Sequence, residues 1–418
     1  MLLEFRVRNF RSFREEAVLS LAASADMQFA DTHTVATGMD KLPRVVRTAA
    51  IYGANASGKS NLIKALQFMQ SMVLTSSQVQ PDAENNLVPF RLRENADDFA
   101  TLMEATFIID GVRHQYGFEL TRKRVTAEWL LVYEKSKPQA WFSRTFDERK
   151  GRYSYTYSDY FTGRKSVWEA ATRKEVLFLT TAVQLNNEQL KPLYQQLASD
   201  LVIFLDGARI GFDFSAGFVE KEGNAARMAA FLAAADTGIS SVAIQNQGAK
   251  QVHFDLLTNQ HKVDDVEMKI PHFGHRVEGR EYLLEMAEES AGTQLFFNLS
   301  GPLLDILERG RLLIVDELDS SLHPLLVQRI VDMFQSPDTN PKGAQLVFTT
   351  HDVSLMDSQK MRRDQVWFTE KDNDQVSHLF PLLDFSPRKG EALEKNYLSG
   401  RYGGIPILGQ MKETATHG

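Results

Sequence analysis

The chain has 418 residues, of which 43% are hydrophobic and 24% charged, and this is ordinary for a soluble globular protein of two or three domains. It contains no cysteine, which excludes disulfides, thiolate metal sites and a cysteine nucleophile. The net charge of −7 argues against an extensive nucleic-acid-binding surface, and no apolar run approaches the roughly 20 residues of a membrane span. We therefore expect a cytoplasmic protein with no membrane contact.

In the first third of the chain, the sequence predicts several strands and a single helix between them in sequence order. Leu3–Phe10 alternates apolar and charged residues, as is typical of a half-buried strand, and a second strand is predicted at Ala17–Ala22. The segment 45–52 predicts a buried strand, and a helix follows it from Asn61. Closely spaced strands then run from Leu102 to Tyr157 and predict an antiparallel sheet rather than further βαβ units.

The rest of the chain returns to alternating helices and strands. Val167–Leu197 and Ala225–Ala235 favour helices, with a short strand at Leu201–Leu205 between them. Apolar strands that alternate with helices are typical of a parallel sheet covered on both faces. The later strands are predicted at Glu281–Met286, Leu312–Val315, Gln345–Thr349 and Val366–Phe368, and the later helices at Gly292–Glu308 and Leu322–Phe334.

The parallel pattern is split between the two ends of the chain. We therefore expect an α/β protein with a mixed sheet, in which a parallel core and an antiparallel β lobe are interrupted by an inserted, mainly helical subdomain. The expected division is 1–135 for the first half of the core with the β lobe, 136–280 for the insertion, 281–410 for the second half and 411–418 for a frayed tail.

Gly53–Ser60 reads Gly-Ala-Asn-Ala-Ser-Gly-Lys-Ser, a phosphate-binding loop pattern between a predicted strand and a predicted helix. Gly53 and Gly58 let backbone N–H groups turn toward a phosphate chain, and the helix N-terminus adds its partial positive charge. We expect Lys59 to reach the β- and γ-phosphates and Ser60 to offer its hydroxyl to Mg²⁺. The residues expected to contact the nucleotide here are Gly53, Ala54, Asn55, Ala56, Ser57, Gly58, Lys59, Ser60 and Asn61.

The apolar strand Leu312–Val315 ends in two acids, Asp316 and Glu317. At the carboxyl edge of a sheet Asp316 would lie beside the Mg²⁺ shell, and Glu317 would polarise the attacking water as a general base. Taken alone, such a strand end is more often one that is stopped by two solvated carboxylates. Beside a phosphate-binding loop, the catalytic interpretation is favoured.

Two further segments carry polar residues that suit a triphosphate. Glu289–Gln294 begins a predicted helix with small residues, so Ser290 and the neighbouring N–H groups form a second anion site. The strand Gln345–Thr349 is followed by His351, and a histidine at that strand end can donate a hydrogen bond to a γ-phosphate.

The order of these motifs resembles the ABC-type ATPase heads of the SMC and RecF class, and the opening segment Val7–Phe13 is similar to that class as well. The resemblance implies an ABC-type head that binds and hydrolyses ATP with Mg²⁺ and works as a homodimer of heads or a higher homo-oligomer. It assigns Ser290, Gly292 and Thr293 to the signature motif, Asp319 to the D-loop and His351 to the switch histidine.

Asp236–Ile239 and Gly400–Pro406 resemble a bacterial branch of stand-alone ATPases found at abortive-infection and restriction loci. That branch includes the ATPase of the PARIS anti-phage system. The resemblance implies a nucleotide-dependent scaffold or sensor that answers a phage trigger protein and controls a separate effector, a toxin or nuclease encoded nearby. The alternative is a RecF/SMC-like repair ATPase that binds DNA itself.

Two features depart from the class. The insertion of about 150 residues lacks heptads, so a long DNA-tethering coiled coil is not expected. The glutamine of the Q-loop has no clear place, because Gln115 lies in a predicted strand.

Five lesser candidates have ordinary structural explanations. Asp372–Asp374 is similar to a nuclease carboxylate pair, but a hairpin turn is favoured. Pro271–His275 suggests a metal site, but no third ligand keeps the spacing and a loop is favoured. The basic runs Arg122–Arg124 and Arg362–Arg363 are more often solvated faces than DNA contacts. The aromatic segment Tyr153–Phe161 is expected to pack internally, with a partner surface as the alternative.

Overall fold

The structure is a computed structural model that describes residues 1–134, 137–205, 211–235, 237–255, 260–320, 322–388 and 390–406. Asp236 and the tail 411–418, for which expectations were given above, lie outside the described residues. None of the helices in the described part of the chain is both long and apolar enough to cross a membrane.

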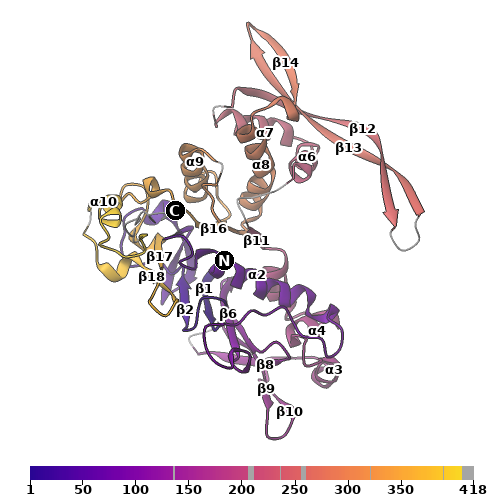
Figure 1. The fold of residues 1–418 in the computed structure, drawn as a ribbon, viewed down its shortest axis with the longest axis vertical. Coiled ribbons are helices and arrows are strands. Elements are labelled where there is room, and N and C mark those ends of the chain that lie inside the picture. The colour runs from indigo at the N-terminus through magenta and orange to yellow at the C-terminus, as the bar shows by residue number, and fades with distance from the viewer. Residues whose placement is uncertain are drawn as a thin grey trace, which may run out of the picture.

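A six-stranded sheet lies at the centre of the protein (Figure 1), with the strand order β11-β15-β16-β5-β17-β18. The first five strands are parallel, and β18 pairs antiparallel with β17. Their bounds are β5 (Thr48–Gly53), β11 (Leu201–Phe204), β15 (Leu312–Val315), β16 (Gln345–Thr349), β17 (Val366–Lys371) and β18 (Ser377–Pro381). Because β5 stands between β16 and β17, the two distant parts of the sequence form one sheet.

A seven-stranded antiparallel sheet forms the second layer, with the order β10-β9-β8-β7-β6-β1-β2. Its bounds are β1 (Leu2–Arg8), β2 (Ala17–Ser20), β6 (Thr101–Ile109), β7 (Val112–Leu120), β8 (Val125–Tyr133), β9 (Gln139–Asp147) and β10 (Arg152–Tyr157). This sheet is the predicted β lobe. Its register continues from β8 to β9 and β10, so it extends across the expected boundary at residue 136.

Alternate residues of the central strands face two different cores. In β5, Ala49 and Ile51 pack toward α2 and the antiparallel sheet, whereas Ala50 and Tyr52 pack toward α7–α10. A strand buried on both faces must be apolar throughout, which explains the continuous apolar runs of the sequence. Helix bounds on the first side are α2 (Lys59–Thr75), α3 (Lys165–Ala171), α4 (Phe178–Gln184) and α5 (Lys191–Ala198). On the second side they are α6 (Asp213–Val219), α7 (Asn224–Ala233), α8 (Ala291–Arg309), α9 (Pro324–Gln335) and α10 (Leu393–Leu398).

Smaller elements complete the body. A short helix, α1 (Ala30–His33), leads into the two-stranded sheet of β3 (Thr34–Met39) and β4 (Leu42–Val46). The α/β class with a mixed sheet and an antiparallel lobe is confirmed.

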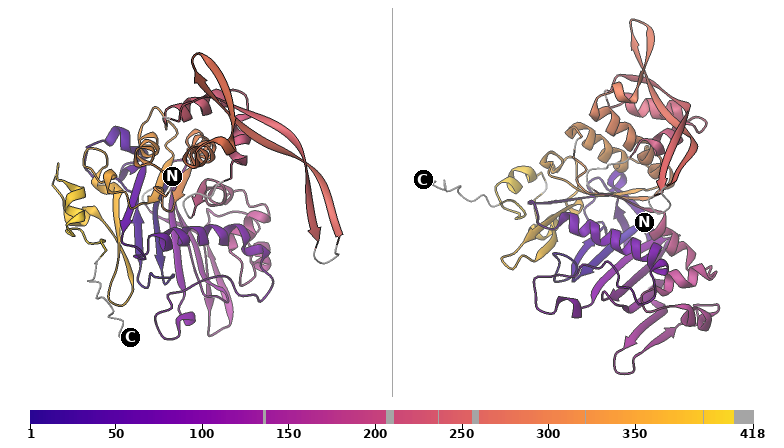
Figure 2. Two further views of the ribbon diagram at one scale, coloured as in Figure 1. Left: turned by 45° about the horizontal axis from the view of Figure 1, so that its top comes forward. Right: turned by 45° about the vertical axis from the view of Figure 1, so that its right-hand side comes forward.

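A long antiparallel ribbon leaves the body beside α6–α8 (Figures 1 and 2). It consists of β12 (Ile239–Asp255) and β13 (Gln260–Val277), and β14 (Arg280–Glu285) is a third strand at one end. The sequence analysis did not predict β12 or β13. The loop predicted at Pro271–His275 is wrong, because these residues form part of β13 and pair with β12. Residues 245–248 and 267–268 of the ribbon are exposed, so burial imposes no alternation of apolar and polar residues on this part of the two strands.

Candidate nucleotide-binding site

The phosphate-binding loop joins β5 to α2 and depends on a glycine at position 58. Gly58 has φ of 121°, and a Cβ there would lie 2.5 Å from Oγ of Ser377. A side chain would therefore force the loop away from β18, so glycine is needed both for the backbone conformation and for the close approach. Ala56 also has a positive φ, of 62°. The loop is thus held in a conformation that an ordinary turn would not adopt.

Buried hydroxyls tie this loop to its neighbours. Ser377 Oγ lies 2.6 Å from the carbonyl oxygen of Ser57 and 2.8 Å from Ser12 Oγ. Asn61 donates to Ser12 Oγ at 2.8 Å, and Ser57 Oγ lies 2.6 Å from Oγ1 of Thr369. The supporting residues Ser12, Thr369 and Ser377 were not predicted as site residues. Only Ser12 carried a signal, because it lies in the opening segment that resembles the SMC and RecF class.

Lys59 is buried at the start of α2, with 6% of its surface exposed. Its ammonium group donates to the carbonyl oxygens of Gly53 at 2.8 Å and Ala54 at 3.2 Å. Burial lowers the pKa of Lys59, and charge attraction from three carboxylates opposes that shift. These carboxylates are those of Asp316, Glu317 and Asp319. The loop and the acidic strand end, which are far apart in the sequence, therefore share one electrostatic environment.

The strand order explains why the phosphate-binding loop and the acidic strand end lie close together. β15, β16 and β5 are adjacent and parallel, so the residues that follow them meet at one carboxyl edge. Asp316 follows β15, the phosphate-binding loop follows β5, and Thr350 and His351 follow β16. The backbone N–H of Thr350 donates to the carbonyl oxygen of Ile51 at 3.2 Å, which continues the pairing to the edge.

Thr349 connects Asp316, the predicted magnesium ligand, with Glu317, the predicted general base. Its buried Oγ1 donates to Oδ1 of Asp316 at 2.7 Å and accepts the backbone N–H of Glu317 at 2.7 Å. One hydroxyl thus orients the Asp316 carboxylate and holds the chain where Glu317 departs from the sheet. Thr349 had no predicted role, because a threonine at a strand end is common. Its role becomes apparent only from its hydrogen-bond partners in the structure.

Asp316 and Glu317 differ sharply in exposure. The Asp316 residue is 3% exposed, whereas Glu317 is open to solvent. The difference comes from the backbone, since Glu317 has φ of 55° and leaves the strand in a left-handed conformation. The Glu317 carboxylate therefore stands at the surface of the edge, where an attacking water would arrive.

Asp319 and His351 lie side by side at the same edge. The backbone N–H of His351 donates to Oδ2 of Asp319 at 3.1 Å. Oδ1 of Asp319 is buried and has no hydrogen-bond partner within the described ranges. The D-loop and switch positions expected from the resemblance are thus directly bonded to each other.

Ser290 is the N-cap of α8. Its Oγ accepts the backbone N–H of Thr293 at 3.1 Å and lies 2.9 Å from Oγ1 of Thr293, while Gly292 is exposed. The N–H of Thr293 is therefore occupied by the cap. α8 packs with α6 and α7, on the opposite side of the central sheet from α2 (Figure 1). No hydrogen bond joins Ser290 to residues 53–61 in the part of the chain that the structure describes.

Gln115 lies in β7 within the antiparallel sheet. Its side chain bonds Glu104 and Tyr133 at 2.9 Å each. It takes no part in the carboxyl edge, and the Q-loop position stays unassigned.

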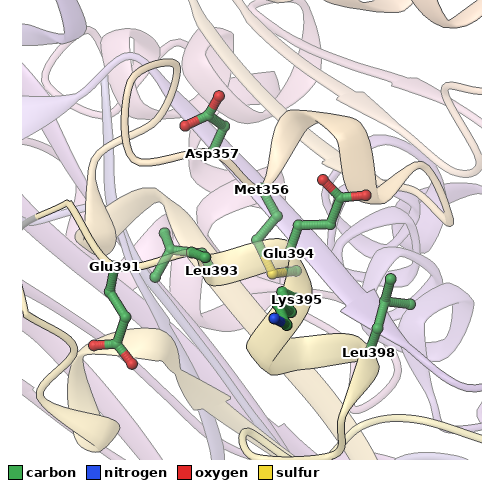
Figure 3. A pocket seen from close by; sticks show the side chains of 8 residues that line it. Met356, Asp357, Glu391, Leu393, Glu394, Lys395 and Leu398 are labelled. Atoms are coloured by element: carbon green, nitrogen blue, oxygen red, sulfur yellow. The ribbon is translucent and has the colours of Figure 1, made fainter.

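Two surface pockets lie near this edge and differ in charge. A pocket of about 290 Å³ is bounded by the outer turn of the phosphate-binding loop, by β17 and by Gly404 and Ile405 of the Gly400–Pro406 segment. A pocket of about 400 Å³ lies between α10 and the segment after His351, as Figure 3 shows. Asp357, Glu391 and Glu394 outnumber Lys395 around the second pocket, so its charge disfavours a triphosphate.

The lesser candidates have structural partners. Asp372–Asp374 forms the turn between β17 and β18, as predicted. In the basic runs, Arg122 pairs with Glu84 at 2.8 Å, Arg362 with Asp364 at 2.6 Å and Arg363 with Asp26 at 2.5 Å. In the aromatic segment, Tyr155, Tyr157 and Phe161 pack around Phe178, as expected. Tyr160 does not pack internally, because it is 58% exposed.

The fold and this edge define a P-loop nucleotide-binding protein of the α/β class. The family described as "AAA domain, putative AbiEii toxin, Type IV TA system" matches residues 49–357, and the chain belongs to this family of ATPases. No curated protein is significantly similar to the chain in sequence.

Two solved structures of SMC heads are similar to the chain. The SMC head domain from Thermotoga maritima is 14% identical, with 91% of this chain and 98% of that chain covered and a TM-score of 0.42. An SMC head bound to the C-terminal winged-helix domain of ScpA is 12% identical, with 91% and 96% covered and a TM-score of 0.41.

Proposed function

We propose that the chain hydrolyses ATP with Mg²⁺ in a dimer of ABC-type heads and thereby acts as the scaffold or sensor subunit of an anti-phage defence system. The observation that carries the ATPase part is the gathering of Lys59 and the Asp316–Asp319 carboxylates at one edge of the central sheet. The edge combines the buried Lys59, the glycine-rich loop after β5 and the buried Asp316 after β15, which is the second strand away from β5. These groups together suit a metal-bound triphosphate.

Each residue of this edge has a distinct task. Lys59 would exchange its bonds to Gly53 and Ala54 for bonds to the β- and γ-phosphates, which is favourable because its ammonium group is already desolvated. Glu317 would accept a proton from the attacking water, and His351 would donate to the γ-phosphate. Asp319, bonded to the His351 backbone, would keep that segment in place.

The residues present also fit a magnesium ion. The Asp316 carboxylate is oriented by Thr349, and the Ser60 hydroxyl stands at the start of α2, so two hard oxygen ligands come from adjacent sides of the edge. The ion would offset the negative charge that develops on the phosphates.

Ser290, Gly292 and Thr293 would complete the site from a second copy of the chain. α8 has 19 residues and is about 28 Å long, and it leads from Ser290 on the far side of the sheet to the start of β15. A partner related by twofold symmetry would bring its own Ser290 to the phosphate-binding loop of the first subunit. This trans arrangement is the part of the proposal that is easiest to test.

The test mixes two inactive variants. Ser290→Arg blocks the trans surface but keeps an intact loop, and Lys59→Ala destroys the loop but keeps an intact Ser290. In a mixture of the two, roughly a quarter of the composite sites would be intact, so ATPase activity should reappear. A mixture that stays as inactive as its components would contradict the trans site.

The matched control mixes Lys59→Ala with Asp316→Ala. Both residues belong to the same half of the site, so every composite site in that mixture carries one defect and no activity should return. Activity in this control mixture would show that subunit mixing restores turnover by some other route.

The defence role is supported by the description of the family, which names a toxin and a toxin–antitoxin system. The effector would then be a separate protein. Co-purification with the product of an adjacent gene, and its release by ATP or by a phage protein, would support this role.

A DNA-repair ATPase is the alternative. The arginines Arg122, Arg362 and Arg363 are all paired with carboxylates, which leaves these three side chains poorly suited to phosphate contacts. Turnover stimulated by duplex DNA, with an affinity that falls steeply as salt rises, would favour the repair function over the defence function.

A further inference from the structure

The ribbon ends, near the predicted signature residue, in a hairpin formed by β14 and residues 272–277 of β13. Val277 pairs with Arg280 across a two-residue turn in which Glu278 has φ of 49° and Gly279 has φ of 81°. Positive φ at both turn positions is the geometry of a tight type I′ hairpin. The strand β12 begins at Ile239, opposite His275, so the tip of the hairpin extends beyond the third strand.

Each face of this hairpin carries an exposed apolar side chain among charged neighbours. Tyr282 is 51% exposed and Leu283 is 57% exposed, and as neighbours in a strand they point to opposite faces. Val277 at the tip is 56% exposed. A two-stranded hairpin is marginally stable in water by itself, and grouped exposed apolar side chains mark surfaces that bind a partner. At the base of the hairpin Phe273 is buried against Phe297 of α8, whereas Val277, Tyr282 and Leu283 toward the tip are exposed in the described part of the chain.

The hairpin is held firmly to the segment that leads to Ser290. His275 Nε2 lies 2.5 Å from Oε1 of Glu289, the residue directly before Ser290. The side chain of Glu289 is only 8% exposed. The segment between β14 and α8 is a single 3₁₀ turn (Met286–Glu288) closed by reciprocal bonds between Glu285 and Glu288. A displacement of the hairpin would therefore also move Ser290, because the segment between them is short and held by hydrogen bonds.

A second contact fixes β13 against its neighbours. Ser241 Oγ donates to Glu281 at 2.8 Å, and Ser240 Oγ donates to the carbonyl oxygen of Gly274 at 3.0 Å. A Cβ at Gly274 would lie 2.7 Å from Oε1 of Glu281, so only glycine allows this approach. The three strands thus form one unit with the N-terminus of α8.

We infer that the β13–β14 hairpin docks on a second copy of this chain when ATP is bound, and that it positions Ser290 there. This inference rests on the proposed trans site. Only five residues separate Leu284, at the end of the hairpin, from Ser290, so a surface that receives Ser290 must also lie beside the hairpin. The second copy is therefore the occupant that covers Tyr282 and Leu283, and the His275–Glu289 pair makes His275 a positioning residue.

The test uses thiol labelling in a chain that has no cysteine of its own. Leu283→Cys is combined with Glu317→Gln, which holds ATP without hydrolysing it, and the rate of maleimide labelling is measured with and without ATP. We expect ATP to slow labelling at least tenfold. The control is Tyr160→Cys in the same background, because Tyr160 is 58% exposed in the antiparallel lobe and should label equally in both states.

A second measurement addresses the energy of docking. Tyr282→Glu in the Glu317→Gln background should weaken ATP-dependent dimerisation at least tenfold by light scattering, while Tyr160→Glu should leave it unchanged. His275→Gln keeps a donor toward Glu289 and should dimerise better than His275→Ala. If both His275 variants behave alike, His275 has no positioning role.

The outcomes separate this inference from the proposed function. Dimerisation of Glu317→Gln with unchanged labelling at Leu283→Cys would overturn the hairpin contact and leave the trans site standing. Protection that requires an added effector protein, and not ATP, would assign the hairpin to that effector and overturn the inference. Failure of Glu317→Gln itself to dimerise with ATP would overturn both.

Discussion

The carboxyl edge of the central sheet and the β13–β14 hairpin are built in opposite ways. At the edge, Asp316 and Thr349 are buried beneath other elements, and their bonds are already made. At the hairpin, Tyr282 and Leu283 point to opposite faces, and more than half of each residue's surface is exposed. The comparison separates two tasks: chemistry needs groups that are oriented before the nucleotide arrives, whereas assembly needs a surface that gains its contacts only with a partner.

The largest expected effect is at the edge. Glu317→Gln removes the general base but keeps size and polarity, so we expect turnover to fall by about 10²- to 10⁴-fold while ATP still binds. Single-turnover hydrolysis and binding of a fluorescent ATP analogue measure the two effects separately. Glu188→Gln, at an exposed carboxylate in the other lobe, is the matched control and should be silent. Wild-type turnover in Glu317→Gln would remove this residue from the base role.

The second prediction compares one leucine from each region. Leu313→Ala opens a cavity in the buried strand β15 and should lower the free energy of unfolding by about 2–5 kcal/mol. Leu283→Ala removes an exposed side chain and should change it by less than about 0.5 kcal/mol without ATP. Urea denaturation of the two variants measures both. A large loss for Leu283→Ala would mean that the hairpin already packs against its own chain, and the contrast between the regions would disappear.

The smallest expected effect concerns orientation within the edge. Thr349→Val keeps the shape of the side chain but leaves Asp316 Oδ1 and the Glu317 N–H without their partner, a loss of about 1–3 kcal/mol. We expect turnover to slow by roughly tenfold or more with little change in ATP affinity. Thr180→Val, which removes a buried hydroxyl bond to the Val73 carbonyl far from the edge, should lower stability but not turnover. Equal turnover in the two variants would contradict the orienting role of Thr349.

The sequence by itself predicted the segments that the structure brings together at the carboxyl edge. The glycine-rich loop, the Asp316–Glu317 strand end and the His351 strand end were all found from local patterns, because each follows an apolar strand and apolar strands are readable from composition alone. The antiparallel lobe was also predicted, since its strands follow one another closely with only short turns between them.

Only the tertiary structure decided which residues support those segments and where the partner surface lies. Ser377, Thr369 and Thr349 are ordinary hydroxyl residues until strand pairing places them beside the loop and beside Asp316. The strands β12 and β13 were not predicted, because residues such as 245–248 and 267–268 are exposed and burial imposed no alternation of apolar and polar residues on them. Local patterns of apolar and polar residues reflect which residues are buried. The contacts that join distant parts of a chain arise only once the chain has folded, so these patterns do not contain them.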